Sequence, residues 1–154
     1  MSKRSKHAAL PQIIPAVGEF QFEDGSTYQG MYNDNLTDNS KTREGKGECK
    51  SEEGVYIGDW VNDAMEGNGQ YTSYATKETY SGSFKNNLYD GFGKYIFMSG
   101  SFYEGEWKEG RMHGKGIFVD DFGEKWGGSF KEGVYDAWNE WQPNIANSGD
   151  ARTS

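Results

Sequence analysis

The chain has little of what an enzyme or a disulfide-bonded protein needs. Its 154 residues include one cysteine, two histidines and three prolines. With Cys49 alone, no intrachain disulfide forms, and a reduced, cytoplasmic compartment is expected. No stretch approaches the ~20 apolar residues of a membrane span. The basic start Met1–Lys6 is not followed by an apolar run, so no secretory signal peptide is expected.

Candidate catalytic residues are too few and too scattered to form a recognisable constellation. His7 lies near the start of the chain, and His113 stands alone beside Gly114. A lone histidine is a weak signal, so a structural role for His113 is favoured over catalysis. The Gly-x-Gly motifs lack the third glycine of a dinucleotide-binding fingerprint. The sequence therefore predicts a non-enzymatic protein with no cofactor and no metal site.

What the chain has instead is a repeated phrase of two aromatic residues around a glycine. It reads YQGMY from Tyr28, YIGDW from Tyr56, YSGSF from Tyr80, YEGEW from Tyr103 and WGGSF from Trp126. Successive phrases begin 28, 24, 23 and 23 residues apart. A nearly fixed period of this length predicts stacked repeat units rather than one closed globule.

Each unit is predicted to form one β-hairpin. Alternate residues of a strand share a face, so both rings of a phrase point the same way. The glycine between them leaves a gap into which a neighbouring ring is expected to lean. A Gly-x-Gly follows the first four phrases, at residues 45–47, 67–69, 91–93 and 114–116. Hairpins in series predict an all-β fold, an elongated single-layer twisted antiparallel sheet.

The phrase followed by a short turn and Gly-x-Gly resembles the MORN repeat, and the best copy is Tyr103–Phe118. The resemblance spans residues 18–133, as four full repeats with a partial repeat at each end. It implies a single-layer sheet of hairpins. The chain is similar to short MORN-only proteins of cilia, flagella and sperm and to radial spoke head proteins, which implies a structural scaffold of the axoneme, such as the radial spoke. Other family members imply two alternatives, a membrane-associated phosphoinositide-binding module or a soluble adaptor for a motor or signalling protein.

The aromatic stripe leaves two interpretations open. Hydrophobic residues make up 34% of the chain and aromatic residues 16%, so a deep aliphatic core is not expected. Either the rings are simply the core, or one layer leaves part of the stripe open as a groove for a helix or extended segment of a partner. The second interpretation predicts these partner-binding residues: Tyr28, Tyr32, Tyr56, Trp60, Tyr80, Phe84, Tyr103, Trp107, Trp126, Phe130, Trp138 and Trp141.

The charge of the repeats indicates which partners they suit. The chain has a net charge of −8, and because Lys3, Arg4 and Lys6 are basic, residues 12–149 carry −11. This disfavours nucleic acid as a partner and anionic membrane lipid. It favours basic segments of axonemal or cytoskeletal proteins. Open strand edges also predict self-association.

The two ends depart from the repeat pattern. Residues 1–17 form an arm, basic and then carrying Ile13 and Ile14, that is either a disordered terminus or an anchor on the first hairpin or a neighbour. Residues 134–143 are expected to form a cap with a short helix, in which Trp138 and Trp141 either cover the last repeat or anchor a partner. Residues 144–154 are expected to be disordered.

Two further departures lie inside the array. Residues 35–44 read as an insertion that lengthens the loop of the first hairpin. The fifth phrase is not followed by a Gly-x-Gly. Both predict that the first and last hairpins differ from the three between them.

Overall fold

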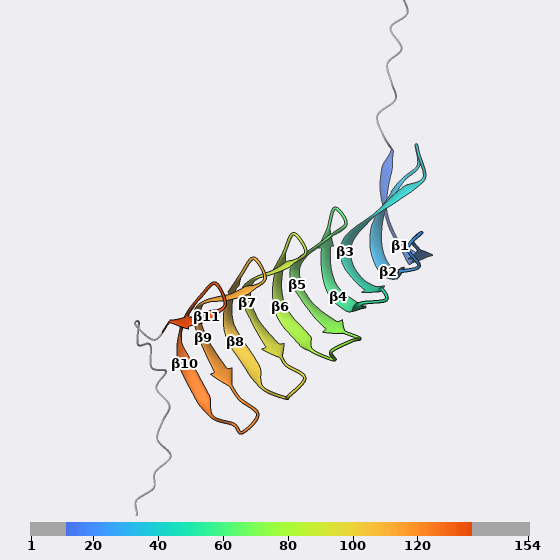
Figure 1. Cartoon of the computed structure of the whole chain (residues 1–154). Coiled ribbons are helices and arrows are strands. Elements are labelled where there is room, and N and C mark those ends of the chain that lie inside the picture. The colour runs from blue at the N-terminus through green and yellow to red at the C-terminus, as the bar shows by residue number, and fades with distance from the viewer. Residues whose placement is uncertain (1–11, 137–154) are drawn as a thin grey trace, which may run out of the picture.

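The computed structural model describes residues 12–136, and all regular elements among them are β-strands. Eleven strands follow one another in chain order in one sheet, and Figure 1 shows them as curved ribs side by side along one axis. They are β1 Ile13–Gln21, β2 Thr27–Asn35, β3 Ser40–Lys50, β4 Gly54–Val61, β5 Ala64–Ser73, β6 Thr79–Lys85, β7 Leu88–Ile96, β8 Phe102–Lys108, β9 Arg111–Val119, β10 Lys125–Lys131 and β11 Val134–Asp136. Every neighbouring pair is antiparallel. This confirms the predicted single-layer sheet of hairpins, while the expected helix with Trp138 and Trp141 lies outside the described residues.

The strands are joined by one kind of turn at one of their ends and by another kind at the opposite end, and these two rows of turns form two long edges of the sheet. Four hairpins end in two-residue turns with positive φ at both positions, as at Asn86 (47°) and Asn87 (67°). Such type I′ turns match the twist of the flanking strands. We call the edge that carries these turns the tip edge. The longer turns that join one hairpin to the next form the opposite, link edge, at residues 22–26, 51–53, 74–78, 97–101 and 120–124.

The two glycines of each Gly-x-Gly have different roles. The first takes a positive φ, 71° at Gly67 and 104° at Gly91, opposite a shift of register in the paired strand. The second lies under an aromatic ring, and a Cβ at Gly69 would overlap the ring of Tyr56. A Cβ at Gly58, the glycine between the two rings of the phrase, would also overlap Tyr56. The predicted gap at that glycine is therefore filled by the first tyrosine of the same phrase rather than by a neighbour's ring.

Eight rings form one continuous series of edge-to-face contacts, which we call the ring ladder. In spatial order they are Tyr28, Trp60, Tyr56, Phe84, Tyr80, Trp107, Tyr103 and Phe130. Successive ring centroids lie 4.7–5.7 Å apart with interplanar angles of 74–88°. In the second, third and fourth phrases, the second ring thus lies between the tyrosine of its own unit and that of the preceding unit. Such aromatic pairs are favourable beyond the area they bury, so the ladder joins each hairpin to the next.

Backbone carbonyl groups satisfy the polar atoms of these buried rings. In the four phrases that begin with tyrosine, the hydroxyl donates to the carbonyl oxygen three residues later, at 2.6–3.0 Å. The indole Nε1 of Trp107 donates to the carbonyl oxygen of Gly93 at 3.0 Å. These four tyrosine rings and the Trp107 ring are therefore fixed in orientation as well as buried.

The first hairpin accommodates its insertion as longer strands rather than as a longer loop. β2 continues to Asn35 and β3 begins at Ser40, so only residues 36–39 form the turn. β1 pairs with β2 along its whole length, from Ile13 opposite Asn35 to Gln21 opposite Thr27. Ile13 and Ile14 therefore lie on the first hairpin.

The last hairpin has no Gly-x-Gly, and a ring from its second strand covers the glycine of its phrase instead of the phrase's own first ring. Trp126 has no hydroxyl group and is 46% exposed. Tyr135 of β11 instead lies over Gly128 and donates to the carbonyl oxygen of Gly127 at 3.3 Å. Its ring is 5.4 Å from that of Phe130, and the ladder ends against it.

The fit between glycine and ring predicts a site-specific loss of stability. A Cβ added at Gly82 would lie 2.6 Å from the carbonyl oxygen of Phe92, whereas one at Gly18 would lie 3.3 Å from the Tyr32 ring. We expect Gly82→Ala to lower the free energy of unfolding by about 3 kcal/mol, as overpacking does, and Gly18→Ala by less than about 1 kcal/mol. Urea unfolding followed by circular dichroism measures both. Equal stability of the two variants would contradict the proposed fit.

Candidate functional site

Most of the binding residues predicted from the sequence lie in the ring ladder. The eight ladder rings are each 7% exposed or less, so a partner would reach little of their surface. Tyr32 is half-buried and Trp126 is 46% exposed. Trp138 and Trp141 lie outside the described residues. The eight ladder rings are thus core residues. A role in partner binding for the twelve residues predicted from the sequence stays a prediction.

Two further rows of side chains border the ladder, and the sequence analysis did not single them out as binding residues. All come from the second strand of a hairpin, two positions before the first glycine or two positions after the second glycine of Gly-x-Gly. That spacing is the signal that would have found them. The row near the tip edge is Arg43, Met65, Tyr89 and Met112, and the row near the link edge is Cys49, Tyr71, Tyr95 and Phe118; each is partly buried against its paired ring.

A hollow of about 370 Å³ opens on this face in the third and fourth units, and we call it the aromatic hollow. Its walls are mostly apolar, formed by Tyr89, Tyr95, Phe97, Trp107 and Met112, with Arg111 as the one charged residue that lines it. The tip-edge glycines of two turns also line it, although Phe97 belongs to the link edge. The curvature of the strands in Figure 1 therefore brings both edges of the sheet towards one space.

The walls of the aromatic hollow are held by contacts with one another. Tyr89 stacks flat on Tyr80, with centroids 3.9 Å apart and an interplanar angle of 13°. The ring centroid of Tyr95 lies 4.8 Å from that of Phe97 and 5.9 Å from that of Trp107. The hollow is thus a preformed and largely apolar surface, of the kind that binding sites present.

At the other end of the ladder a cation covers the rings. The Arg43 guanidinium lies 4.1 Å from the ring centroid of Trp60 and 4.9 Å from that of Phe22. Its Nε is 3.0 Å from Asp63 Oδ1, and Nη2 donates to the Asp63 carbonyl oxygen at 3.0 Å. Stacking and ion pairing together close this end of the ladder, and the hollow on this face opens in the later units.

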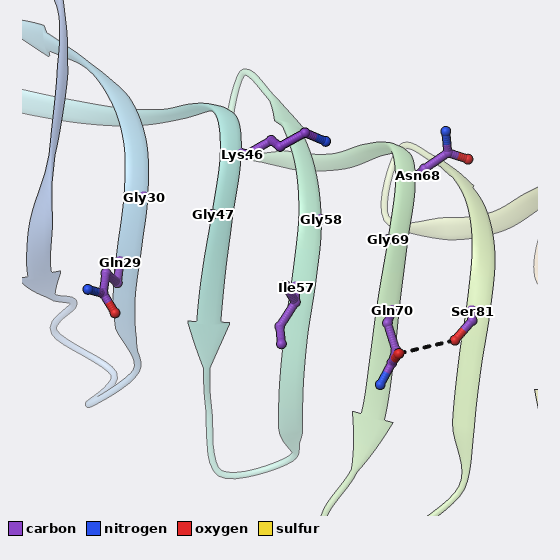
Figure 2. Close-up of a pocket in the computed structure, with 10 residues that line it drawn as sticks. All are labelled: Gln29, Gly30, Lys46, Gly47, Ile57, Gly58, Asn68, Gly69, Gln70 and Ser81. Carbon is purple, nitrogen blue, oxygen red and sulfur yellow. Dashed lines mark hydrogen bonds between the residues drawn. The ribbon is translucent and has the colours of Figure 1, made fainter.

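The opposite face of the sheet carries a different, shallow trough of about 590 Å³. Figure 2 shows its side chains in two rows, with Lys46 and Asn68 towards one end of the strands and Gln29, Ile57, Gln70 and Ser81 towards the other. Ser81 and Gln70 share a hydrogen bond of 3.3 Å. The polar groups do not converge on one point, and the floor is the backbone of four glycines. This face therefore offers less specific recognition than the aromatic hollow.

Burial and hydrogen bonding set the ionisation of the groups on the aromatic face. Burial raises the pKa of Tyr89 to about 12, and it also raises the pKa of Tyr95, which donates to Glu78 Oε2 at 2.7 Å. That hydrogen bond holds the pKa of Glu78 below its ordinary value. At neutral pH the face therefore presents neutral tyrosines with an ionised carboxylate at its link edge.

Over residues 12–136, no group of three or more His, Cys, Asp or Glu side chains is placed to hold a metal ion. In the same range, no helix is long and apolar enough to cross a membrane.

His113 lies directly before the first glycine of its Gly-x-Gly. Glu66 and Asp90 hold the same position in the two preceding units, where each carboxylate accepts a hydrogen bond from a backbone N–H of the next tip-edge turn.

The family model described as MORN repeat matches residues 56–74, 80–102 and 103–121. The chain is a MORN-repeat protein. The matched segments cover β4 to β9, where the ring ladder is most regular. The chain is 32% identical over 123 residues to Alsin of Homo sapiens and of Mus musculus, which covers 76% of this chain and 7% of either relative. It thus spans less than a tenth of the length of these curated relatives.

Rat Alsin (Rattus norvegicus) is 26% identical over 136 residues, which is 85% of this chain and 8% of the relative. MORN repeats are generally non-enzymatic and mediate protein or membrane interactions. The chain therefore carries repeats of a family that mediates protein or membrane interactions.

The tyrosines predict how the fold responds to alkali. Burial raises the pKa of Tyr28 and Tyr89 to about 12 from an ordinary value of 10.0, and it also raises that of Tyr56, Tyr80 and Tyr103. The folded state holds these protons more tightly, so the stability they contribute is complete below pH 10 and is lost as the pH rises towards 12. We expect ultraviolet tyrosine titration to coincide with unfolding by circular dichroism. Ionisation of all ten tyrosines near pH 10 in a folded protein would contradict this.

Proposed function

We propose that the protein is a non-enzymatic scaffold that holds a segment of a partner protein in the aromatic hollow of its MORN sheet. The observation that carries the proposal is the hollow itself. The ladder rings are closed off, yet the side chains beside them leave about 370 Å³ open between Tyr95, Phe97 and Met112. An open apolar surface of this kind marks a partner site.

The shape of the site favours a ligand that lies along the array. Side chains of three neighbouring strands, β7, β8 and β9, line the hollow, so the ligand crosses the strands rather than following one of them. An apolar side chain on a helix or an extended segment fits between Tyr95 and Met112. Methionine adapts its shape to what it contacts, which suits a surface that seats a side chain from another protein.

We further propose that the partner is a cytoskeletal subunit of a ciliary or flagellar axoneme, such as the radial spoke. The support is the resemblance of the repeats to radial spoke head proteins and to short MORN proteins of cilia and sperm. Association with phosphoinositide membranes and a soluble adaptor role are the alternatives. The net charge of −8 weighs against anionic lipid.

Partner recruitment should depend on the walls of the aromatic hollow. We expect the double change Phe97→Ser with Met112→Ser to weaken recruitment about tenfold, the effect of losing ~1.4 kcal/mol of binding free energy. Phe92→Ser is the matched control, because Phe92 is 60% exposed and alternation in β7 places it on the opposite face. Proximity labelling of tagged copies measures recruitment. Equal labelling by the double variant and the wild type would contradict the site.

The cellular place is tested by fractionation of a tagged copy from ciliated cells. Axonemes washed with detergent and salt are compared with the membrane fraction and the soluble fraction. Retention on the washed axoneme is the expected result, since a built-in subunit is held by extensive contacts. Release with the detergent-soluble membranes would favour lipid association, and recovery in the soluble fraction would favour the adaptor role.

A further inference from the structure

The link edge holds most of the net negative charge of the sheet. Residues 12–136 contain 22 carboxylates and 12 lysine or arginine residues, a net charge of −10. The five link-edge turns contribute −7 of this, since Lys77 is their single cation. Their carboxylates are Glu23, Asp24, Glu52, Glu53, Glu78, Asp120, Asp121 and Glu124.

Few of these link-edge charges are neutralised within the sheet. Between residues 12 and 136 there are six ion pairs, and none includes a link-edge carboxylate. Two of the acids have a structural task, because Asp24 and Asp120 accept backbone N–H groups within their own turns. Glu78 accepts hydrogen bonds from Tyr95 and from the backbone of Met98. The other five carboxylates are left to face a partner.

A second hollow of about 320 Å³ lies at this edge, lined by Glu78, Phe97, Met98, Phe118 and two serines. We call it the link-edge hollow. Glu78 accepts the Tyr95 hydroxyl at 2.7 Å and the Met98 N–H at 3.5 Å, so its carboxylate is fixed in place. Phe97 also lines the aromatic hollow, which places the two hollows side by side.

Large apolar side chains stand exposed beside the acids. Met98 is 76% exposed, Phe122 87%, Tyr74 41% and Trp126 46%. Tyr74, Met98 and Phe122 belong to the last three link-edge turns, and Trp126 lies near the start of β10, directly after the last of these turns. Apolar surface next to uncompensated negative charge fits a ligand that is apolar on one side and positively charged on the other.

We propose that the link edge docks a basic amphipathic segment of the partner protein, with a lysine or arginine side chain in the link-edge hollow against Glu78. The inference rests on the proposed scaffold function and names the chemistry of its partner. The aliphatic stem of such a side chain packs on Phe97, Met98 and Phe118, while its charged head meets the carboxylate. Apolar side chains of the same segment reach the aromatic hollow next to it.

Two synthetic helical peptides probe this proposal with the full chain. One carries leucine on one face and lysine on the other, and the second replaces every lysine with glutamine. We expect the lysine peptide to bind at least about tenfold more tightly in fluorescence anisotropy. Its affinity should fall as salt rises from low to physiological concentration, because partly exposed charges are screened.

Two matched variants locate the charge effect. Glu78→Gln removes one charge at the link-edge hollow and keeps an acceptor for Tyr95, while Glu109→Gln removes one charge at the tip edge. We expect Glu78→Gln to weaken binding of the lysine peptide about fivefold, near the upper limit for a partly exposed ion pair. Glu109→Gln should change it less than about twofold. Circular dichroism confirms that both variants are folded.

The outcomes separate this inference from the function on which it rests. Equal affinity for the two peptides, or equal weakening by the two variants, would overturn docking at the link edge and leave the apolar site in place. Failure of both peptides to bind the wild-type chain would count against both proposals. A lysine peptide that binds the wild type and loses affinity with Glu78→Gln alone supports the link edge.

Discussion

The fit of a tyrosine ring over two glycines on adjacent strands is the contact on which the rest of the sheet depends. In the third unit, the Tyr80 ring covers Gly82 and Gly93, and its hydroxyl group reaches the Ser83 carbonyl oxygen at 2.9 Å. The buried ring then provides the surface on which Phe84 and Trp107 pack edge to face. Because the sheet has one layer, its stability comes from such neighbour contacts repeated along the array.

This arrangement divides the core and the partly exposed surface beside it between the two strands of each hairpin. The first strand supplies the rings of the ladder, and the second strand supplies the rows that border it. Positions in those rows vary from unit to unit, with a cation at Arg43, thioethers at Met65 and Met112, and a ring at Tyr89. A constant core with a variable border lets a regular scaffold present one open hollow in its later units and a closed surface at its start.

The hairpins, their order and the single layer were predictable because the period and the alternation of rings are local patterns. The candidate site was less predictable from the sequence. The residues that recur most regularly, such as Tyr56 and Trp60, recur because they form the buried core, so regular spacing does not mark the open surface. The extension of the first hairpin depends on pairing of β1 with Asn35, a contact distant in sequence. The curvature depends on left-handed glycines such as Gly91, whose φ no spacing rule reveals.

Native-state hydrogen exchange read by mass spectrometry tests most directly whether the ring ladder joins the hairpins into one cooperative unit. The account predicts that amides of β4 to β9 exchange with a common, large opening free energy, while β1 and β11 at the ends of the array exchange sooner. Separate exchange of each hairpin, with opening free energies unrelated to its place along the ladder, would contradict it.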